Sequence, residues 1–287
     1  MTKYLLHFPE KWQFNAGTII DDIIKAFSRE HRDVFSAIRT AIVGSINGIN
    51  WLLSIIPWWL LILAVALLGI KVSGKKRTGL LYAVMLFFVG SCGLWEQMLE
   101  TLSIVIASVI LSVIMGFPLG ILVAMNKRAE GIIRPVLDLM QTMPTFVYLV
   151  PAVILFSTGK TPALIATTIY AIVPMIRMTS HGITHVDFEV VEASRAFGST
   201  TMQSLVKVQI PQALPTIMTG INQTIMMAMS MVVTCALIGA NGLGMEILLA
   251  TNRTEMGKAL MPGISIVAVA IIIDRLTQGL ITKKEAE

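Results

Sequence analysis

The sequence predicts an all-α polytopic membrane protein with about seven transmembrane helices. Hydrophobic residues make up 55% of the 287 residues and charged residues only 14%, at a mean hydropathy of +0.78. In a soluble globular protein about a quarter of the residues are charged. Stretches long and apolar enough to cross about 30 Å of hydrocarbon as helices recur along the chain. They are residues 51–70, 80–97, 99–124, 136–157, 162–178, 217–239 and 260–281, and the fifth of them is the shortest.

The basic residues predict the orientation of these spans, because Lys and Arg beside a span are retained on the cytoplasmic side. With seven spans, one side of the membrane carries Lys71, Lys75, Lys76, Arg77, Lys127, Arg128, Arg134, Arg177, Arg195, Lys207, Lys283 and Lys284. The opposite loops hold Lys160, Arg253 and Lys258. We therefore expect the N-terminus outside, the C-terminus inside and residues 180–211 in the cytoplasm. The net charge of +5 reflects topology in this interpretation, and no nucleic-acid partner is expected.

Residues 1–50 are expected to form an extracytoplasmic amphipathic helical segment. From Thr18 onward, apolar residues recur at helical spacing with charged residues between them, and Asp21 and Asp22 interrupt the apolar core that a signal peptide needs. The helix lies either on the membrane surface or against its own protein. The rest divides into two accessory spans, residues 51–98, and a core of residues 99–281.

The longest polar interruption in the second half of the chain is residues 180–211. Residues 190–197 have the composition of a short helix, and Gly198 supplies the left-handed residue that commonly ends one. The sequence therefore predicts a short helix, a glycine turn and a second helix.

The second helix is expected to begin at Thr200, which forms a capping-box pattern with Gln203. Pro211 and Pro215 are expected to stop it before the next span. The result is a compact helix–Gly–helix unit tethered at both ends to membrane helices.

This loop resembles the cytoplasmic EAA motif of the membrane permeases of bacterial ABC importers. The motif reads Glu-Ala-Ala, three residues, Gly, nine residues, Ile, any residue, Leu and Pro. Here Glu192, Ala193, Gly198 and Pro211 match in register, with Ser194, Val208 and Ile210 in place of the second Ala, the Ile and the Leu. Residues 138–148, 196–201, 220–223 and 239–244 are similar to the glycine betaine, proline betaine and choline permeases within this group, and the similarity covers roughly residues 90–287.

The resemblance implies the type I (MetI-like) ABC importer fold and a division of labour. Two copies of such a permease form the pathway in the bacterial cell membrane, two cytoplasmic subunits bind ATP, and an external binding protein delivers the substrate. The loop residues implied to couple the permease to its ATPase are Glu192, Ala193, Ser194, Arg195, Ala196, Phe197, Gly198, Ile210 and Pro211. Because the chain lacks a GxxxxGK[ST] phosphate loop, ATP and Mg²⁺ are expected on the partner subunit. No enzymatic activity and no cofactor are expected in this chain.

Polar side chains inside spans are costly and therefore indicate function. The candidates for lining a pathway are Gln141, Thr142, Tyr148, Asn222, Gln223 and Ser230. Asp138 lies near a span end, where pairing with an arginine such as Arg134 is an equal alternative. His181 and His185 stand at i and i+4, but without a third ligand in an established pattern no metal site is expected.

The function expected is import of glycine betaine or a related quaternary ammonium osmolyte, with proline betaine, choline and carnitine left unranked. The alternative is an ion-coupled secondary transporter without an ATPase, which would need carboxylates or histidines near span centres. An intramembrane enzyme would need a nucleophile or metal site, and the spans contain neither pattern.

Overall fold

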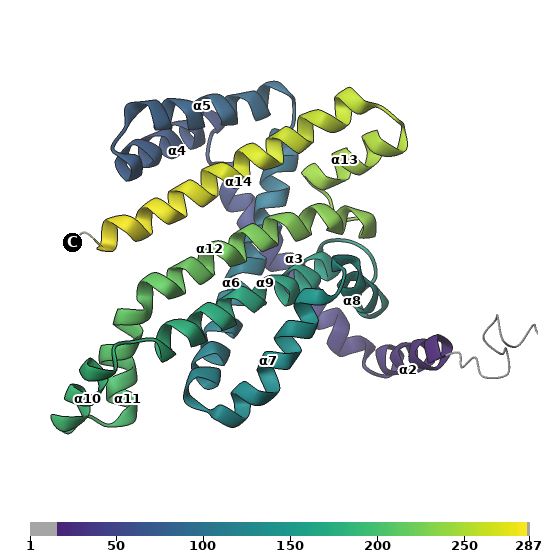
Figure 1. Cartoon of the computed structure of the whole chain (residues 1–287). Coiled ribbons are helices and arrows are strands. Elements are labelled where there is room, and N and C mark those ends of the chain that lie inside the picture. The colour runs from purple at the N-terminus through teal and green to yellow at the C-terminus, as the bar shows by residue number, and fades with distance from the viewer. Residues whose placement is uncertain (1–15, 286–287) are drawn as a thin grey trace, which may run out of the picture.

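The computed structural model describes residues 16–285, and these residues are helical almost throughout (Figure 1). The helices are α2 (Ala16–Glu30), α3 (Arg32–Ile55), α4 (Trp58–Ser73), α5 (Lys76–Ser91), α6 (Trp95–Met125), α7 (Lys127–Thr142), η2 (Thr145–Tyr148), α8 (Leu149–Phe156), α9 (Lys160–Thr184), α10 (Phe188–Ala196), α11 (Thr201–Ser204), η3 (Leu205–Gln209), α12 (Ile210–Thr234), η4 (Cys235–Ile238), α13 (Leu243–Asn252) and α14 (Met256–Glu285). The predicted all-α membrane class is confirmed.

Four helical stretches of the described chain are long and apolar enough to cross a membrane: α6, α9, Thr201–Ile238 and Met256–Gly279. Two further pairs qualify only when joined, and both are sharply bent, α3 with α4 by 90° and α7 with η2 and α8 by 113°. The hairpin partner of α4, α5, has 16 residues. The expected count of seven spans and the orientation of the termini therefore stay predictions.

Three of the expected spans are not single straight helices. Residues 51–70 cross the bend between α3 and α4, where Ile56 is extended before Pro57. Residues 136–157 are interrupted where Met143 is extended before Pro144. The physical reason is the same in both, because the proline ring disfavours helical geometry for the residue before it. Residues 80–97 cross a turn at Gly93, whose φ is +73°.

The centre of the bundle is α9, which packs between α6 and α12. Glycines let the helices approach closely. A Cβ on Gly120 of α6 would lie 2.5 Å from the Cβ of Thr179, and one on Gly220 of α12 would lie 2.7 Å from the Cβ of Met178. The shortest expected span, residues 162–178, thus falls in the most buried long helix.

The N-terminal helices pack on the rest of the protein. Ile46 of α3 is 1% exposed and joins the core that α6 and α9 form. Of the two alternatives for this segment, packing against its own protein therefore holds for α3. Lys160 ties α3 to the bundle, because its ammonium lies 3.4 Å from Asn47 and 3.3 Å from Glu100. The α4–α5 hairpin lies along α14 (Figure 1). Residues 1–15 lie outside the described residues.

Candidate functional site

The helix predicted in the polar loop is α10, which projects from one end of the bundle beside the start of the long helix that contains α12 (Figure 1). The Asp187 carboxylate accepts a hydrogen bond from the backbone N–H of Glu189 at 3.0 Å and caps the helix N-terminus. Gly198 ends it with a φ of +81°, and its N–H donates to the carbonyl of Arg195 at 2.9 Å. The predicted helix and its glycine stop are confirmed.

The second helix begins where the sequence predicts. Thr200 accepts a hydrogen bond from the backbone N–H of Gln203 at 3.3 Å, and the Gln203 side chain accepts from the backbone N–H of Thr200 at 2.9 Å. This reciprocal capping box is confirmed, and it satisfies backbone donors that the helix itself leaves unpaired.

Pro211 and Pro215 do not stop this helix, contrary to expectation. Residues Thr201–Ile238 form one continuous helical stretch, and both prolines lie within α12. Proline has no N–H and its ring clashes with the carbonyl four residues earlier. The chain accommodates Pro211 with a π-helical segment, η3, in which the N–H of Ile210 donates to the carbonyl of Leu205 five residues back.

The outer surface of α10 is unusually open, since none of its residues is buried. Phe188 is 66% exposed and Phe197, which follows the helix, is 93% exposed. Glu192 and Arg195 are also exposed, and within residues 16–285 neither side chain has an ion pair. Exposed aromatic residues beside unpaired charges are typical of a surface that binds another protein.

The six candidates for lining a pathway divide into two groups. Gln141 and Thr142 of α7 and Gln223 and Ser230 of α12 are exposed in the single chain. On α12, Gln223 and Ser230 lie seven residues apart and therefore share one helical face. These four, like the two buried candidates, stay predicted pathway residues.

Tyr148 and Asn222 are instead buried and have partners within the chain. The Tyr148 hydroxyl donates to the carbonyl of Met140 and so fastens η2 to α7 across the bend. The Asn222 amide binds Asp274 and Thr277 of α14. Sequence reasoning did not single out Asp274, although a carboxylate inside the apolar stretch 260–281 was the signal for it.

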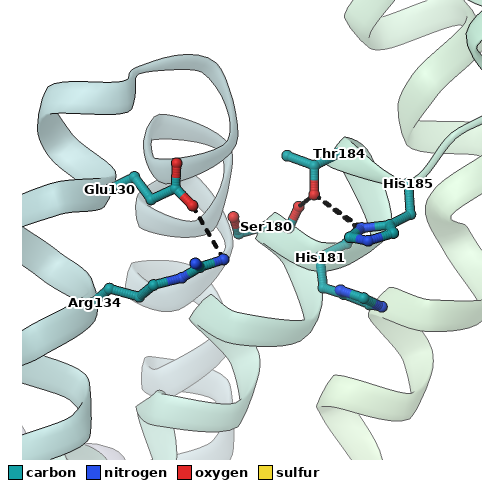
Figure 2. A network of polar contacts seen from close by, with 6 residues as sticks. All are labelled: Glu130, Arg134, Ser180, His181, Thr184 and His185. Carbon is teal, nitrogen blue, oxygen red and sulfur yellow. Dashed lines mark hydrogen bonds and ion pairs between the residues drawn. The ribbon is translucent and has the colours of Figure 1, made fainter.

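Histidines and charged residues gather where α7 and α9 approach the loop (Figure 2). The rings of His181 and His185 lie against each other at a tilt of 38°, with their centroids 3.9 Å apart. Arg134 pairs with Glu130 at 3.0 Å. Asp138 pairs with Arg177. The expected pairing of Asp138 with an arginine is confirmed, but the arginine is not Arg134.

No three His, Cys, Asp or Glu side chains in the described part of the chain could hold a metal ion together. The Thr184 hydroxyl lies 2.9 Å from the Ser180 carbonyl oxygen and 3.2 Å from Nδ1 of His185 (Figure 2). The His185 ring is thus held by hydrogen bonds at the end of α9, and among the described residues the two histidines have no third ligand beside them.

Residues 116–284 match the family model described as "Binding-protein-dependent transport system inner membrane component". The match covers more than half of the chain, including α9, α10 and α12. The chain belongs to this family. The family consists of inner membrane components of transport systems, and the expected resemblance of the chain to such permeases is confirmed.

Related proteins extend the family match over most of the chain. The "Glycine betaine/carnitine transport permease protein GbuB" of Listeria monocytogenes is 41% identical over 93% of this chain and 96% of its own length. The "Glycine betaine transport system permease protein OpuAB" of Bacillus subtilis is 42% identical over 93% and 95%. The "Glycine betaine/proline betaine transport system permease protein ProW" of Escherichia coli is 44% identical over 86% and 70%.

Solved structures support the same fold. A permease chain of the MetNI methionine ABC transporter in an inward-facing conformation matches with a TM-score of 0.55 at 22% identity, over 64% of this chain and 90% of that one. A chain of an amino acid ABC transporter crystallised with histidines matches with a TM-score of 0.54 at 20% identity, over 67% and 92%. The MetI-like permease fold expected from the sequence is confirmed, and α2 to α5 lie outside the family match.

Proposed function

We propose that this permease is the transmembrane subunit of an ATP-driven importer of glycine betaine or a related quaternary ammonium osmolyte. The observation that carries the proposal is α10, a helix without a buried residue at the position of the EAA motif. It would bind a groove of a cytoplasmic ATPase subunit and convert closure of that subunit into reorientation of the membrane helices. ATP and Mg²⁺ would be bound by the ATPase subunit.

The substrate class rests on the names of the relatives. GbuB, OpuAB and ProW are named as glycine betaine permeases, and a more distant relative of Bacillus subtilis is named as a choline permease. A betaine carries no net charge, so a pathway lined by neutral residues such as Gln223 and Ser230 suits it. An external binding protein would select the substrate, in an aromatic cage that attracts the quaternary ammonium.

The complete importer would contain two copies of this chain, two ATPase subunits and the external binding protein, in the cell membrane. The four exposed pathway candidates support this arrangement, because polar side chains on membrane helices are favourable when they face another subunit or a water-filled path. The bounds of the N-terminal, accessory and core segments remain part of the proposal.

An ion-coupled secondary transporter would need a carboxylate free to bind the ion. Among the described residues, Glu100 and Asp138 are paired with Lys160 and Arg177, and Asp274 accepts hydrogen bonds from Asn222 and Gln278. Its role within the chain is therefore to join α12 to α14, and this favours the ATP-driven mechanism.

Uptake of radiolabelled glycine betaine in proteoliposomes tests the proposal. The permease is co-expressed with its ATPase and binding protein, and uptake is measured with ATP, with a non-hydrolysable analogue, and with ion gradients collapsed. We expect uptake only with ATP and no effect of the gradients. Uptake that needs an ion gradient but not ATP would establish the secondary transporter instead, and excess unlabelled carnitine, choline and proline betaine rank the substrates.

A further inference from the structure

Inside the loop, a row of hydrogen bonds joins α10 to the beginning of the long helix. Nε2 of Gln209 donates to Oγ of Ser204 at 3.5 Å, and the Oγ atoms of Ser204 and Ser194 lie 2.9 Å apart. Ser194 Oγ lies 2.9 Å from the carbonyl oxygen of Val191. Ser204 is 1% exposed, and Ser194 and Gln209 on either side of it are half-buried.

The chemistry of the hydroxyl groups gives this row a direction. Each serine has one proton to donate and can accept two hydrogen bonds. The Val191 carbonyl can only accept, so Ser194 donates to it, and Ser204 in turn donates to Ser194. The Gln209 amide, which directly precedes α12, and both serine hydroxyls then each have an acceptor, and the last acceptor is a backbone carbonyl of α10.

The π-helical segment brings the two ends of the row together. In an α-helix of 3.6 residues per turn, Gln209 would be rotated by roughly 140° from Ser204, five residues earlier. The i to i+5 hydrogen bonding of η3 returns Gln209 to the side of Ser204. Pro211 favours the π-helical segment η3. It thereby helps to place the Gln209 side-chain amide beside Ser204.

The carbonyl at the end of α10 is held as well. Ser199 donates from its hydroxyl to the carbonyl oxygen of Ser194 at 2.6 Å, and its backbone N–H donates to the same oxygen at 3.2 Å. Ser194 is thus fixed through both its side chain and its backbone.

We propose that the hydrogen bond between Ser194 and Ser204, which we name the serine strut, holds α10 at a fixed angle to the long helix and makes both serines positioning residues for coupling to the ATPase. This inference rests on the proposed function. The EAA motif has alanine where this chain has Ser194. With alanine there, the buried proton of Ser204 would have no acceptor, so the two serines are chemically matched.

The test compares Ser194→Ala, Ser204→Ala and the double variant in the reconstituted importer, with Ser45→Ala as control. Ser45 is an exposed serine of α3 whose hydroxyl donates to the Ala41 carbonyl at 2.9 Å. The main measurement is the number of glycine betaine molecules imported per ATP hydrolysed, because a structural defect that only lowers the amount of active protein leaves this ratio unchanged.

Ser194→Ala leaves the Ser204 hydroxyl buried without an acceptor, so we expect the ratio to fall roughly tenfold. Ser204→Ala leaves Ser194 still bonded to Val191, so we expect a fall of about threefold. The double variant should resemble Ser204→Ala, because it removes both members of the pair. Ser194→Thr keeps the hydroxyl and should restore the ratio to within about twofold of the native value.

Amide hydrogen exchange of the permease alone in detergent micelles supplies a second measurement. Ser194→Ala should speed exchange at residues 193–199 at least threefold, whereas Ser45→Ala should not. A normal ratio in Ser194→Ala, or effects of the two single variants that multiply in the double variant, overturns the serine strut. Native protein that imports betaine without ATP overturns the proposed function, and the coupling role of the strut with it.

Discussion

Asn222 of α12 donates a hydrogen bond from Nδ2 to Oδ1 of Asp274 on α14, over 2.8 Å. The Thr277 hydroxyl donates to the side-chain oxygen Oδ1 of Asn222 at 2.6 Å, and Gln278 donates to the same Asp274 oxygen at 2.7 Å. Both ends of a buried amide are therefore occupied by one neighbouring helix. Within an apolar bundle such a contact specifies which faces of α12 and α14 meet.

Replacing Asn222 with alanine should destabilise the permease. The change removes one donor from Asp274 and one acceptor from Thr277, which keep Gln278 and the Ile273 carbonyl as partners, so we expect a loss of about 1 kcal/mol from the missing hydrogen bonds between the helices. We expect a lower thermal unfolding midpoint in detergent. Gln223→Ala, one residue along and exposed, is the matched control, and equal midpoints for the two variants would contradict the prediction.

Gly120→Ala should loosen the contact between α6 and α9. The new Cβ would lie 2.5 Å from Cβ of Thr179 and 2.9 Å from the carbonyl oxygen of Ile176, and overpacking of this kind costs about 1–3 kcal/mol. Gly48→Ala on α3 meets no atom within 4 Å and should be neutral or slightly stabilising. Thermal unfolding of the two variants side by side checks this, and the prediction fails if Gly120→Ala unfolds no earlier than Gly48→Ala.

Gly198→Ala should weaken coupling through backbone strain alone. No atom lies within 4 Å of the position of the new Cβ, but a φ of +81° costs a residue with a side chain roughly 1–2 kcal/mol. We expect a lower yield of betaine imported per ATP hydrolysed. Gly131→Ala, also in open space but in α7, should leave that yield at the native value; a loss in both variants would point to a cause other than the turn.

Phe197→Ala should weaken binding of the ATPase subunit without destabilising the permease. Phe197 is 93% exposed, so its removal leaves no cavity in the permease. Truncation of an aromatic residue at the centre of an interface lowers the binding affinity by roughly tenfold or more. Titration of the purified ATPase onto immobilised permease measures the effect. Met256→Ala, 86% exposed beyond α13, is the control, and unchanged affinity in Phe197→Ala would exclude Phe197 from the interface.

Short-range signals in the sequence were sufficient to place the parts of the loop. Gly198 and the Thr200–Gln203 pair lie within a few residues of the backbone groups that they bind, so the sequence identifies the end of α10 and the start of the next helix. The start of α10 at Phe188, capped by Asp187, was not predicted. The family resemblance rested on other residues of the same loop, Glu192, Ala193 and Pro211, together with Gly198. Phe197 could be assigned to the loop, but its exposure depends on how α10 leaves the bundle.

Contacts between distant residues could not be predicted. Asn222 and Asp274 are separated by 52 positions, and nothing local distinguishes an amide that faces a neighbouring helix from one that faces a path. The helix breaks before Pro57 and Pro144 could have been predicted from the prolines themselves. Both prolines lie inside long apolar stretches, so each stretch was interpreted as one span. At Pro211 the same signal misled, because the π-helical segment absorbs the proline within a continuous helix.

The continuity of Thr201–Ile238 has a mechanical consequence. At 1.5 Å per residue, its 38 residues form a rod about 57 Å long, longer than the roughly 30 Å hydrocarbon layer. The rod has one end in the loop under α10 and the other at the turn before α13. Under the proposed function, a displacement of α10 by the ATPase subunit would therefore act on the same helix that reaches the turn before α13, beyond the far side of the hydrocarbon layer.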